Sequence, residues 1–382
     1  MLTVNLQKEA NIASNNRRRR ELLLLQACLA SENDFDHAFM AFDSDRNLDE
    51  LTWGELRLVP YLFRRLEHSL LKTPRFDIYK GVYTKFWYLH KMEKSPTLPF
   101  LLEVLDGVDF LVLKGAALQP LIYSGDPVTR PIDDIDILVS PHERYRALDR
   151  LADAGFTPDQ SWPTELTMDL KLSIGLSKAN HHVDLHWGLY PSAGDTPATN
   201  SIFSRQIAVD DGNLRFSSPS ISDHLVHNLV HGQPNNDVSP IRWALDCALM
   251  SKHPALDWSR VCENAQSWGW QKVVNRQLSY LREVGKVDIP DKVFGMLREG
   301  NNSIPLTFYQ FNRGLKPSLF RGFLSLLVVN PMNLRELSGE FATHHLFHVL
   351  KALRIWLRSW RDSSNRLKRL QRLIKSTQNP AS

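Results

Sequence analysis

The sequence predicts an α+β protein in which a small mixed β-sheet is flanked by N-terminal and C-terminal helical regions. Apolar residues recur at helical spacing before about residue 105 and again beyond residue 218. Between these regions lie short apolar runs and a stretch with a two-residue alternation, which are the patterns of buried and half-buried strands. The chain has 382 residues, enough for about two domains of roughly 100–200 residues each.

The composition is that of a folded globular protein. Hydrophobic residues make up 43% and charged residues 23%, close to the globular averages of about 45–50% and about 25%, which excludes a disordered or collagen-like chain. The three cysteines, Cys28, Cys247 and Cys262, form no CxxC pair. Their spacing argues against a disulfide framework or a zinc site and predicts a cytoplasmic location. No apolar run reaches the roughly 18 residues of a membrane-spanning helix.

The first 105 residues predict an N-terminal helical subdomain (1–105). Its segment "RRRRELLLLQACLA", which begins at Arg17, resembles a secretory signal, but Glu21 and Gln26 interrupt the short apolar run. We therefore interpret it as a buried helix. The segments "TWGELRLVPYLFRRLEHSLL" and "FDIYKGVYTKFWYLHKME" continue the helical spacing.

Residues 106–218 predict the α/β core. A buried strand is expected at 109–114, followed by a helix that starts at Gly115 and has Pro120 near its first turn. The run "DIDILVS" predicts a second strand, and the amphipathic helix after it is expected to end at Gly155. The alternation in "KLSIGLSKANHHVDLHW" predicts a hairpin with its turn at 178–180.

The remainder of the chain predicts a helical subdomain that completes a cleft (219–285) and a C-terminal region (286–382) that ends in a basic amphipathic helix. The whole chain carries a net charge of +4, whereas nine basic residues against one acid between Lys351 and Lys375 give that segment +8. An apolar stripe over 346–375 favours a helix docked on its own protein, ahead of a peripheral contact with the anionic inner face of a membrane. A nucleic-acid partner is the least expected.

Three aspartates mark a candidate metal site. Asp134 and Asp136 share one face of the predicted strand, because side chains alternate along a strand. Asp184 lies in the hairpin strand, on the same face as His186. If the two strands are neighbours, the three carboxylates converge and repel one another, and a divalent cation would relieve this repulsion. Oxygen ligands of this kind suit Mg²⁺.

A small-residue turn next to these acids predicts phosphate binding. Lys114, Gly115 and Ala116 join the first predicted strand to its helix, a geometry in which backbone N–H groups face an anion. Lys114 and Arg130 are candidate phosphate ligands. A phosphate-binding turn opposite three carboxylates outlines a two-metal site for phosphoryl transfer.

The runs "LVLKGAAL", "DIDILV" and "VDLHW" resemble those of the uncharacterised bacterial nucleotidyltransferases, a branch of the DNA polymerase β-like nucleotidyltransferase superfamily, and the resemblance covers about residues 20–250. It places Gly115 and Ala116 in the phosphate-binding turn, where relatives have Gly-Gly or Gly-Ser. It assigns metal binding and catalysis to three residues, Asp134, Asp136 and Asp184.

This resemblance also implies the reaction. Two Mg²⁺ ions, with Mn²⁺ as an alternative, would support transfer of a nucleoside monophosphate from an NTP such as ATP to a small-molecule, sugar or peptide acceptor, with release of pyrophosphate. Members of the branch resemble accessory enzymes of biosynthetic clusters. Two alternatives stay open: a catalytically inert relative that binds or regulates, and a toxin-type transferase that adenylylates a macromolecule.

Several histidines accompany the predicted site. His186 is a candidate for the substrate cleft, as a hydrogen-bonding partner of the acids or as a catalytic group. His224, His227 and His231 fall at i, i+3 and i+7 on one helix face, and His227 and His231 are expected to line the substrate cleft rather than to bind zinc.

Asp246 is the one acid in a buried-looking helix, "RWALDCA". We expect it to pair with Arg242, four residues earlier on the same helix, or to orient one of the histidines.

Overall fold

The computed structural model describes residues 19–44, 51–123, 125–159, 172–189, 197–232 and 240–298. The predicted basic C-terminal helix over 346–375, with its proposed membrane contact, lies outside the described residues. Within them, no helix combines the length and the apolar character needed to cross a bilayer. The subdomain boundaries at residues 105, 218 and 285 stay predictions.

The N-terminal part of the structure is helical, as predicted. Residues 19–29 form a helix, and the following helices are α2 (Phe35–Ser44), α3 (Trp53–Leu56), α4 (Val59–His68), α5 (Phe76–Leu89), the π-helix η2 (His90–Lys94) and α6 (Thr97–Val104). Thr52 begins α3 with a capping box, in which its side chain accepts the Glu55 N–H and the Glu55 carboxylate accepts the Thr52 N–H.

A five-stranded mixed sheet forms the centre of the fold and confirms the predicted fold class. Its strands lie in the order β1 (Phe110–Val112), β2 (Ile135–Val139), β5 (His181–His186), β4 (Ser173–Lys178) and β3 (Thr157–Pro158). Only the β2–β5 pair is parallel among these neighbours. A separate two-stranded sheet consists of β6 (Ile207–Asp210) and β7 (Arg215–Ser218).

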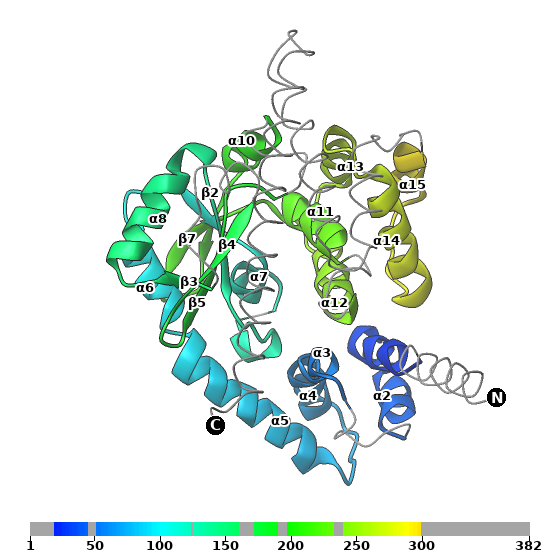
Figure 1. Cartoon of the computed structure of the whole chain (residues 1–382). Helices are drawn as coiled ribbons and strands as arrows, with labels where there is room; N and C mark the ends of the chain where they lie inside the picture. The colour runs from blue at the N-terminus through cyan, green and yellow to red at the C-terminus, as the bar shows by residue number, and fades with distance from the viewer. Residues whose placement is uncertain are drawn as a thin grey trace, which may run out of the picture.

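Helices cover both faces of this sheet. Helices α6 and α8 (Arg144–Asp153) lie on one side, and α7 (Lys114–Ile122) and α11 (Ile221–His231) lie on the other (Figure 1). Ile135, Ile137 and Val139 of β2 pack into the hydrophobic cluster that includes α6 and α8. The residues of opposite parity, Asp136 and Leu138, therefore face the side of α7 and α11.

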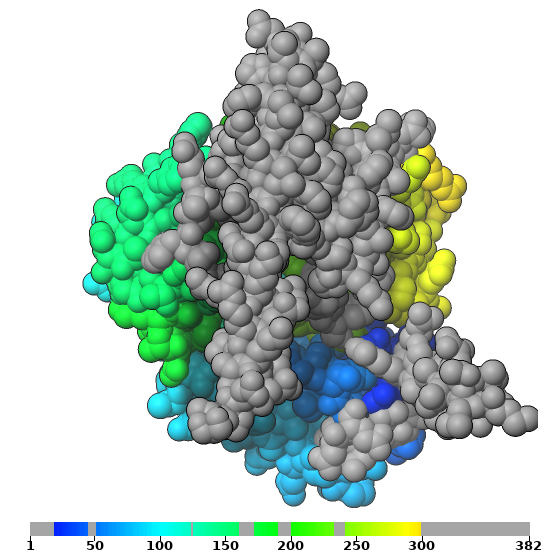
Figure 2. All heavy atoms as spheres, viewed as in Figure 1, coloured from blue at the N-terminus to red at the C-terminus, as the bar shows by residue number. Residues whose placement is uncertain are grey.

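The helices before and after the sheet share one hydrophobic core. The later helices are α10 (Pro197–Ser204), α12 (Pro240–Met250), α13 (Trp258–Ser267), α14 (Gln271–Val284) and α15 (Asp291–Arg298). Phe39 and Leu62 from the N-terminal helices belong to the same buried cluster as Leu225 and Cys262, and α3 contacts α12. In Figure 2 the N-terminal part (blue to cyan) lies below both the C-terminal helices (yellow) and the layer that contains the sheet (green).

The predicted elements of the core are present, with small shifts. The hairpin turns at Ala179 and Asn180, and α8 is followed by Gly155 at φ +86°, a left-handed conformation that suits glycine. The first strand ends at Val112, two residues earlier than predicted, because helix α7 already begins at Lys114. Pro120 lies in the second turn of α7 and not near the first.

Candidate active site

The parallel pairing of β2 with β5 sets the position of two of the predicted acids. Asp136 and Asp184 are register partners across this pair, so their side chains leave the same face of the sheet at the same level. Asp136 is 6% exposed, whereas the Asp184 side chain is 28% exposed. The strands that carry the two aspartates are therefore neighbours, as the sequence analysis required.

His186 lies between these two carboxylates. Its Nε2 is 3.2 Å from Asp136 Oδ1 and 3.0 Å from Asp184 Oδ2. Burial lowers the pKa of His186, but the negative charges of Asp184 and Asp136 outweigh burial and raise it above its ordinary value. The raised pKa favours the imidazolium form of His186, whose positive charge offsets the repulsion between the two acids.

Asp136, Asp184 and His186 each offer a ligand atom, and these atoms all lie within 4.8 Å of one another. Across the described residues, this is the only such group of at least three His, Cys, Asp or Glu side chains. Two carboxylates and an imidazole fit a divalent cation, since carboxylates suit Mg²⁺ and Mn²⁺ and neutral imidazole is a common metal ligand. The sequence analysis placed His186 beside the site but did not include it among the metal ligands.

Lys114 forms an ion pair with Asp136. Its Nζ donates to Asp136 Oδ1 at 2.5 Å, and its backbone has φ +46°, a left-handed conformation that costs a non-glycine residue about 1–2 kcal/mol. Burial raises the pKa of Asp136, but the charge of Lys114 and the hydrogen bond from His186 outweigh it and lower this pKa strongly. No described residue donates to Asp136 Oδ2, which leaves that oxygen for a ligand.

Asp134 lies at the rim of the same pocket, exposed to solvent. It is outside the group of closely spaced ligand atoms. Desolvation within the pocket and the negative charge of Asp136 raise the pKa of Asp134, and Asp184 contributes in the same direction. The structure thus brings the three predicted acids into one electrostatic environment, with Asp136 and Asp184 in closer contact than either has with Asp134.

Gly115 is required by packing within the protein. A Cβ at this position would lie 2.3 Å from Ile132 Cγ2, a distance that real side chains do not reach. The glycine therefore lets the segment before β2 lie against the first turn of α7. Gly115 lines the same pocket as Lys114 and Asp136, whereas Ala116 is 6% exposed and lines a different pocket.

Arg130 is held by Asp246. Its Nε and Nη2 donate to the two carboxylate oxygens of Asp246 at 2.7 and 2.8 Å, and its Nη1 donates to the Pro131 carbonyl at 3.0 Å. Tyr123 Oη also donates to Asp246, at 2.5 Å. The predicted pairing of Asp246 with Arg242 is therefore wrong. The carboxylate turns toward an arginine that is 116 residues away in sequence and offers it a bidentate contact.

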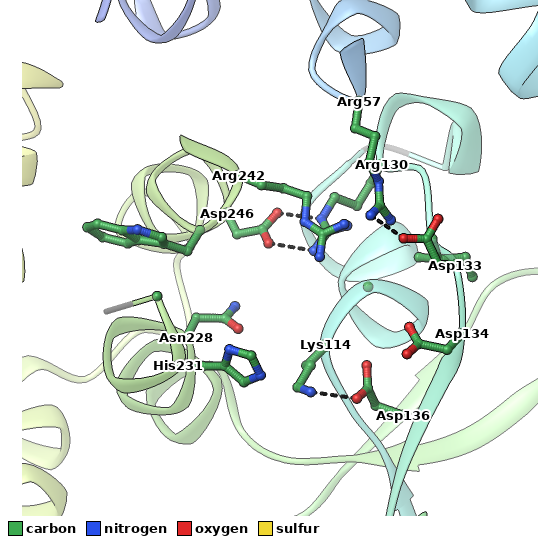
Figure 3. A pocket seen from close by; sticks show the side chains of 14 residues that line it. Arg57, Lys114, Arg130, Asp133, Asp134, Asp136, Asn228, His231, Arg242 and Asp246 are labelled. Atoms are coloured by element: carbon green, nitrogen blue, oxygen red, sulfur yellow. Dashed lines mark hydrogen bonds and ion pairs between the residues drawn. The ribbon is translucent and has the colours of Figure 1, made fainter. Parts of the chain in front are cut away.

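Two further arginines lie beside this pair. Arg57, which follows α3, forms an ion pair with Asp133 and donates to the Pro131 carbonyl at 3.0 Å. Arg242 comes from α12 and lines the pocket together with Arg57 and Arg130. Figure 3 shows these three side chains gathered at one end of the pocket, with Lys114 and Asp136 at the other.

We name the two ends by their residues. The acidic end consists of Lys114, Asp134 and Asp136, which line the pocket, together with Asp184 and His186, whose ligand atoms lie close to that of Asp136. The arginine end consists of Arg57, Arg130, Arg242, Asp133 and Asp246. Sequence reasoning missed Arg57, because nothing in its helical pattern relates it to residues more than 70 positions later.

Helix α11 carries three histidines, of which His231 lines the pocket and His224 and His227 do not. His231 lines the pocket, and its ring centroid lies 5.7 Å from that of His227, which is 4% exposed. His224 Nε2 is 2.8 Å from Ser218 Oγ. Burial lowers the pKa of His224 to about 4 and that of His231 to about 3. Among the described residues these three histidines belong to no metal-binding group.

Comparison with protein families identifies the family of this chain. A family described as uncharacterised nucleotidyltransferase matches residues 92–285, a range that contains β1 to β5, α7, α11 and α12. Every residue of both pocket ends except Arg57 falls within it. No curated protein matches the chain significantly.

Proposed function

Because the chain belongs to the family of uncharacterised nucleotidyltransferases, which are transferases of phosphorus-containing groups, we propose that it moves a nucleoside monophosphate from an NTP to an acceptor that carries a hydroxyl or a phosphate. The acceptor oxygen would form a bond to the α-phosphorus, and the bond from this phosphorus to the β-phosphate oxygen would break, so that pyrophosphate leaves. The acceptor we propose is a small molecule, a sugar or a peptide of a biosynthetic route.

The single observation that carries this proposal is the register of β2 with β5. It aligns Asp136 with Asp184 and brings their ligand atoms and that of His186 within 4.8 Å of one another, inside the range that the family matches. We propose that Asp136 and Asp184 hold a divalent cation, Mg²⁺ or Mn²⁺, with Asp134 at the rim as a further ligand. When bound, such an ion neutralises charge on the phosphates.

The remaining residues support phosphate binding and proton transfer. Lys114 would turn its ammonium group from Asp136 to the phosphates of the bound NTP. The Asp136 carboxylate and the phosphates compete for this one positive charge. Asp134, whose pKa is raised by desolvation and by Asp136, is the strongest base of the three acids and is suited to accept the proton of an acceptor hydroxyl. Arg130 would not contact the phosphates itself but would hold the Asp246 carboxylate in position.

Label transfer tests this proposal. The protein is incubated with each α-³²P-labelled NTP, Mg²⁺ and a cell extract as the source of acceptor. We expect a labelled product with wild type, and a loss of at least about 100-fold in Asp136→Asn, the scale of removing one group that stabilises the transition state. The matched control is Asp149→Asn, which changes an exposed acid of α8. Transfer that Asp136→Asn leaves intact would refute the assignment.

The same experiment separates the two alternatives. Label in the small-molecule fraction supports the proposal, whereas label on protein or nucleic acid would indicate a toxin-type transferase. Binding of the NTP without any transfer, over several extracts, would indicate an inert relative that serves as a binding protein.

A further inference from the structure

Arg242 is the cation of the pocket that lacks a partner among the described residues. The other three cations are paired: Arg57 with Asp133, Arg130 with Asp246, and Lys114 with Asp136. No hydrogen bond joins the Arg242 guanidinium to another described residue, and its Nη1 is buried. A buried donor without an acceptor costs roughly 1–3 kcal/mol, and more when it is charged.

The burial of Arg242 and the charges around it favour the binding of an anion. Burial lowers the pKa of Arg242, and the positive charges of Arg130 and Arg57 lower it further. Asp246 acts in the opposite direction, but both of its oxygens already accept hydrogen bonds from Arg130. Because a guanidinium remains protonated at neutral pH, this position favours the binding of negative charge.

A second donor in the pocket is also without an acceptor. Asn228 of α11 is 6% exposed, and its Nδ2 has no hydrogen-bond partner among the described residues. It lines the same pocket as Arg242, and Figure 3 shows its amide on the α11 side, facing the end that carries Lys114. Unpaired donors from two helices thus line one pocket, whereas buried polar groups are normally satisfied.

The size of the pocket limits its ligand to a small group. Its cavity volume is about 60 Å³, whereas pockets for drug-sized molecules measure roughly 300–1,000 Å³. A wider cavity of about 580 Å³ lies on the other side of Asp134 and is also lined by Asp184. The wider cavity has room for a nucleoside or an acceptor, and the small one has room for a single anionic group.

We propose that Arg242 and Asn228 bind a phosphate group of a substrate within the pocket that both of them line. This inference rests on the proposed function, because the phosphate would come from a reactant of the nucleotidyl transfer. Two reactants can supply it: the terminal phosphate of the NTP, or a phosphate carried by the acceptor. Either source presents the same chemistry to a guanidinium, which binds phosphate oxygens in a bidentate manner.

Calorimetry with inorganic phosphate tests the site directly. The titration is done on the full chain in EDTA, so that no metal-bound phosphate contributes. We expect saturable binding to wild type and binding at least about 10-fold weaker in Arg242→Gln, because a hydrogen bond to a charged group contributes about 1.5–3 kcal/mol. The control Arg215→Gln removes an arginine whose side chain is 87% exposed on β7, and its affinity should equal that of wild type.

A second variant and a second measurement guard against a folding defect. Arg242→Lys keeps the charge but loses the planar fork, so its affinity should lie between those of wild type and Arg242→Gln. Phosphate should also raise the Tm of wild type and leave that of Arg242→Gln unchanged, since a ligand that binds only the folded state stabilises it. Wild-type affinity in both Arg242 variants, or no binding of phosphate to wild type, would overturn the proposal.

Competition identifies the source of the phosphate. If an α,β-methylene NTP analogue with Mg²⁺ displaces inorganic phosphate, the site holds the terminal phosphate of the NTP. If phosphate and the analogue bind together, the site holds a phosphate of the acceptor. Asp136→Asn should still bind phosphate while it loses label transfer. Phosphate binding in a wild-type protein that transfers no label would thus refute the proposed function and leave the phosphate site standing.

Discussion

The acidic end and the arginine end of the pocket are equally rich in charge but are assembled in different ways. Asp136 and Asp184 come from two neighbouring strands, and a single register places them side by side. The arginine end instead combines Arg57 after α3, Arg130 before β2 and Arg242 on α12. Its geometry therefore depends on the contact between the N-terminal helices and α12, whereas the group of Asp136, Asp184 and His186 depends on the pairing of β2 with β5.

The two ends also differ in the sign of their excess charge. The acidic end sets three aspartates against one lysine, and His186 adds a proton that a metal ion would displace. The arginine end sets three arginines against two aspartates. A metal ion bound at the acidic end would neutralise its excess negative charge. A phosphate group bound beside the arginine end would neutralise its excess positive charge. This difference indicates that the pocket suits a ligand whose negative charge is neutralised by a metal ion on one side and by arginines on the other.

Asp246→Ala should give the largest effect, because it breaks the arginine end from within. It leaves Arg130 buried without a carboxylate, next to Arg57 and Arg242. Removing one partner of a buried ion pair costs about 3–5 kcal/mol. Urea unfolding followed by circular dichroism measures this loss in the free energy of unfolding.

The matched variant for Asp246→Ala replaces the pair as a whole. Arg130→Met combined with Asp246→Leu removes both charges and should recover much of the lost stability, since apolar residues of similar volume often replace buried pairs without cost. A double variant as unstable as Asp246→Ala would mean that the hydrogen bond from Tyr123, and not the ion pair, determines stability at the arginine end.

The acidic end could be predicted from the sequence because its signals are local. The alternation in "DIDILVS" places Asp134 and Asp136 on one face of a strand, and the same alternation in "HHVDLHW" places Asp184 on a second strand. The parallel pairing of the two strands then aligns Asp136 with Asp184, whereas Asp134 lies in the bend before β2. His186 shares the Asp184 face in that pattern, so the signal that identifies it as a ligand was present. The sequence nevertheless predicts for His186 a hydrogen-bonding or a catalytic role, and it assigns metal binding to the three aspartates.

The arginine end could not be predicted, because none of its contacts is local. Arg57 meets Asp133 across 76 residues and Arg130 meets Asp246 across 116. The rule that pairs residues four apart on a helix suggested Arg242 for Asp246, but tertiary packing brings in a better partner. Only the contact between helices far apart in sequence creates this end of the pocket, and periodicity does not report such contacts.

Helix α11 lines the pocket with Asn228 and His231, and acid should destabilise this helix through His224. The folded-state pKa of His224 is lowered to about 4 by burial, whereas an unfolded histidine titrates near about 6.5. Between these values the unfolded chain binds the proton and the folded chain does not. Stability is therefore unaffected above about pH 6.5 and falls as the pH drops toward 4, by about 1.4 kcal/mol per pH unit for this one group.

Urea unfolding at pH 7, 6 and 5 tests this dependence. The slope of the free energy of unfolding against pH should be smaller in His224→Gln than in wild type by about 1.4 kcal/mol per unit. His142→Gln, which changes an exposed histidine, should keep the wild-type slope. Equal slopes in wild type and His224→Gln would mean that the folded protein protonates His224 as readily as the unfolded chain does, contrary to a lowered pKa.

Asp133→Asn should give the smallest effect. It tests directly whether the excess positive charge of the arginine end determines phosphate affinity. The Asp133 side chain is 54% exposed, so its ion pair with Arg57 contributes at most about 1 kcal/mol to stability. Its loss removes one of the two acids of the arginine end and increases the excess positive charge there. Affinity for inorganic phosphate should therefore rise, by roughly two- to fivefold, in the opposite direction to Arg242→Gln. Calorimetry measures this change against Asp149→Asn. A decrease in affinity would mean that Asp133 positions Arg57 for the phosphate, and that the arginine end works by geometry more than by net charge.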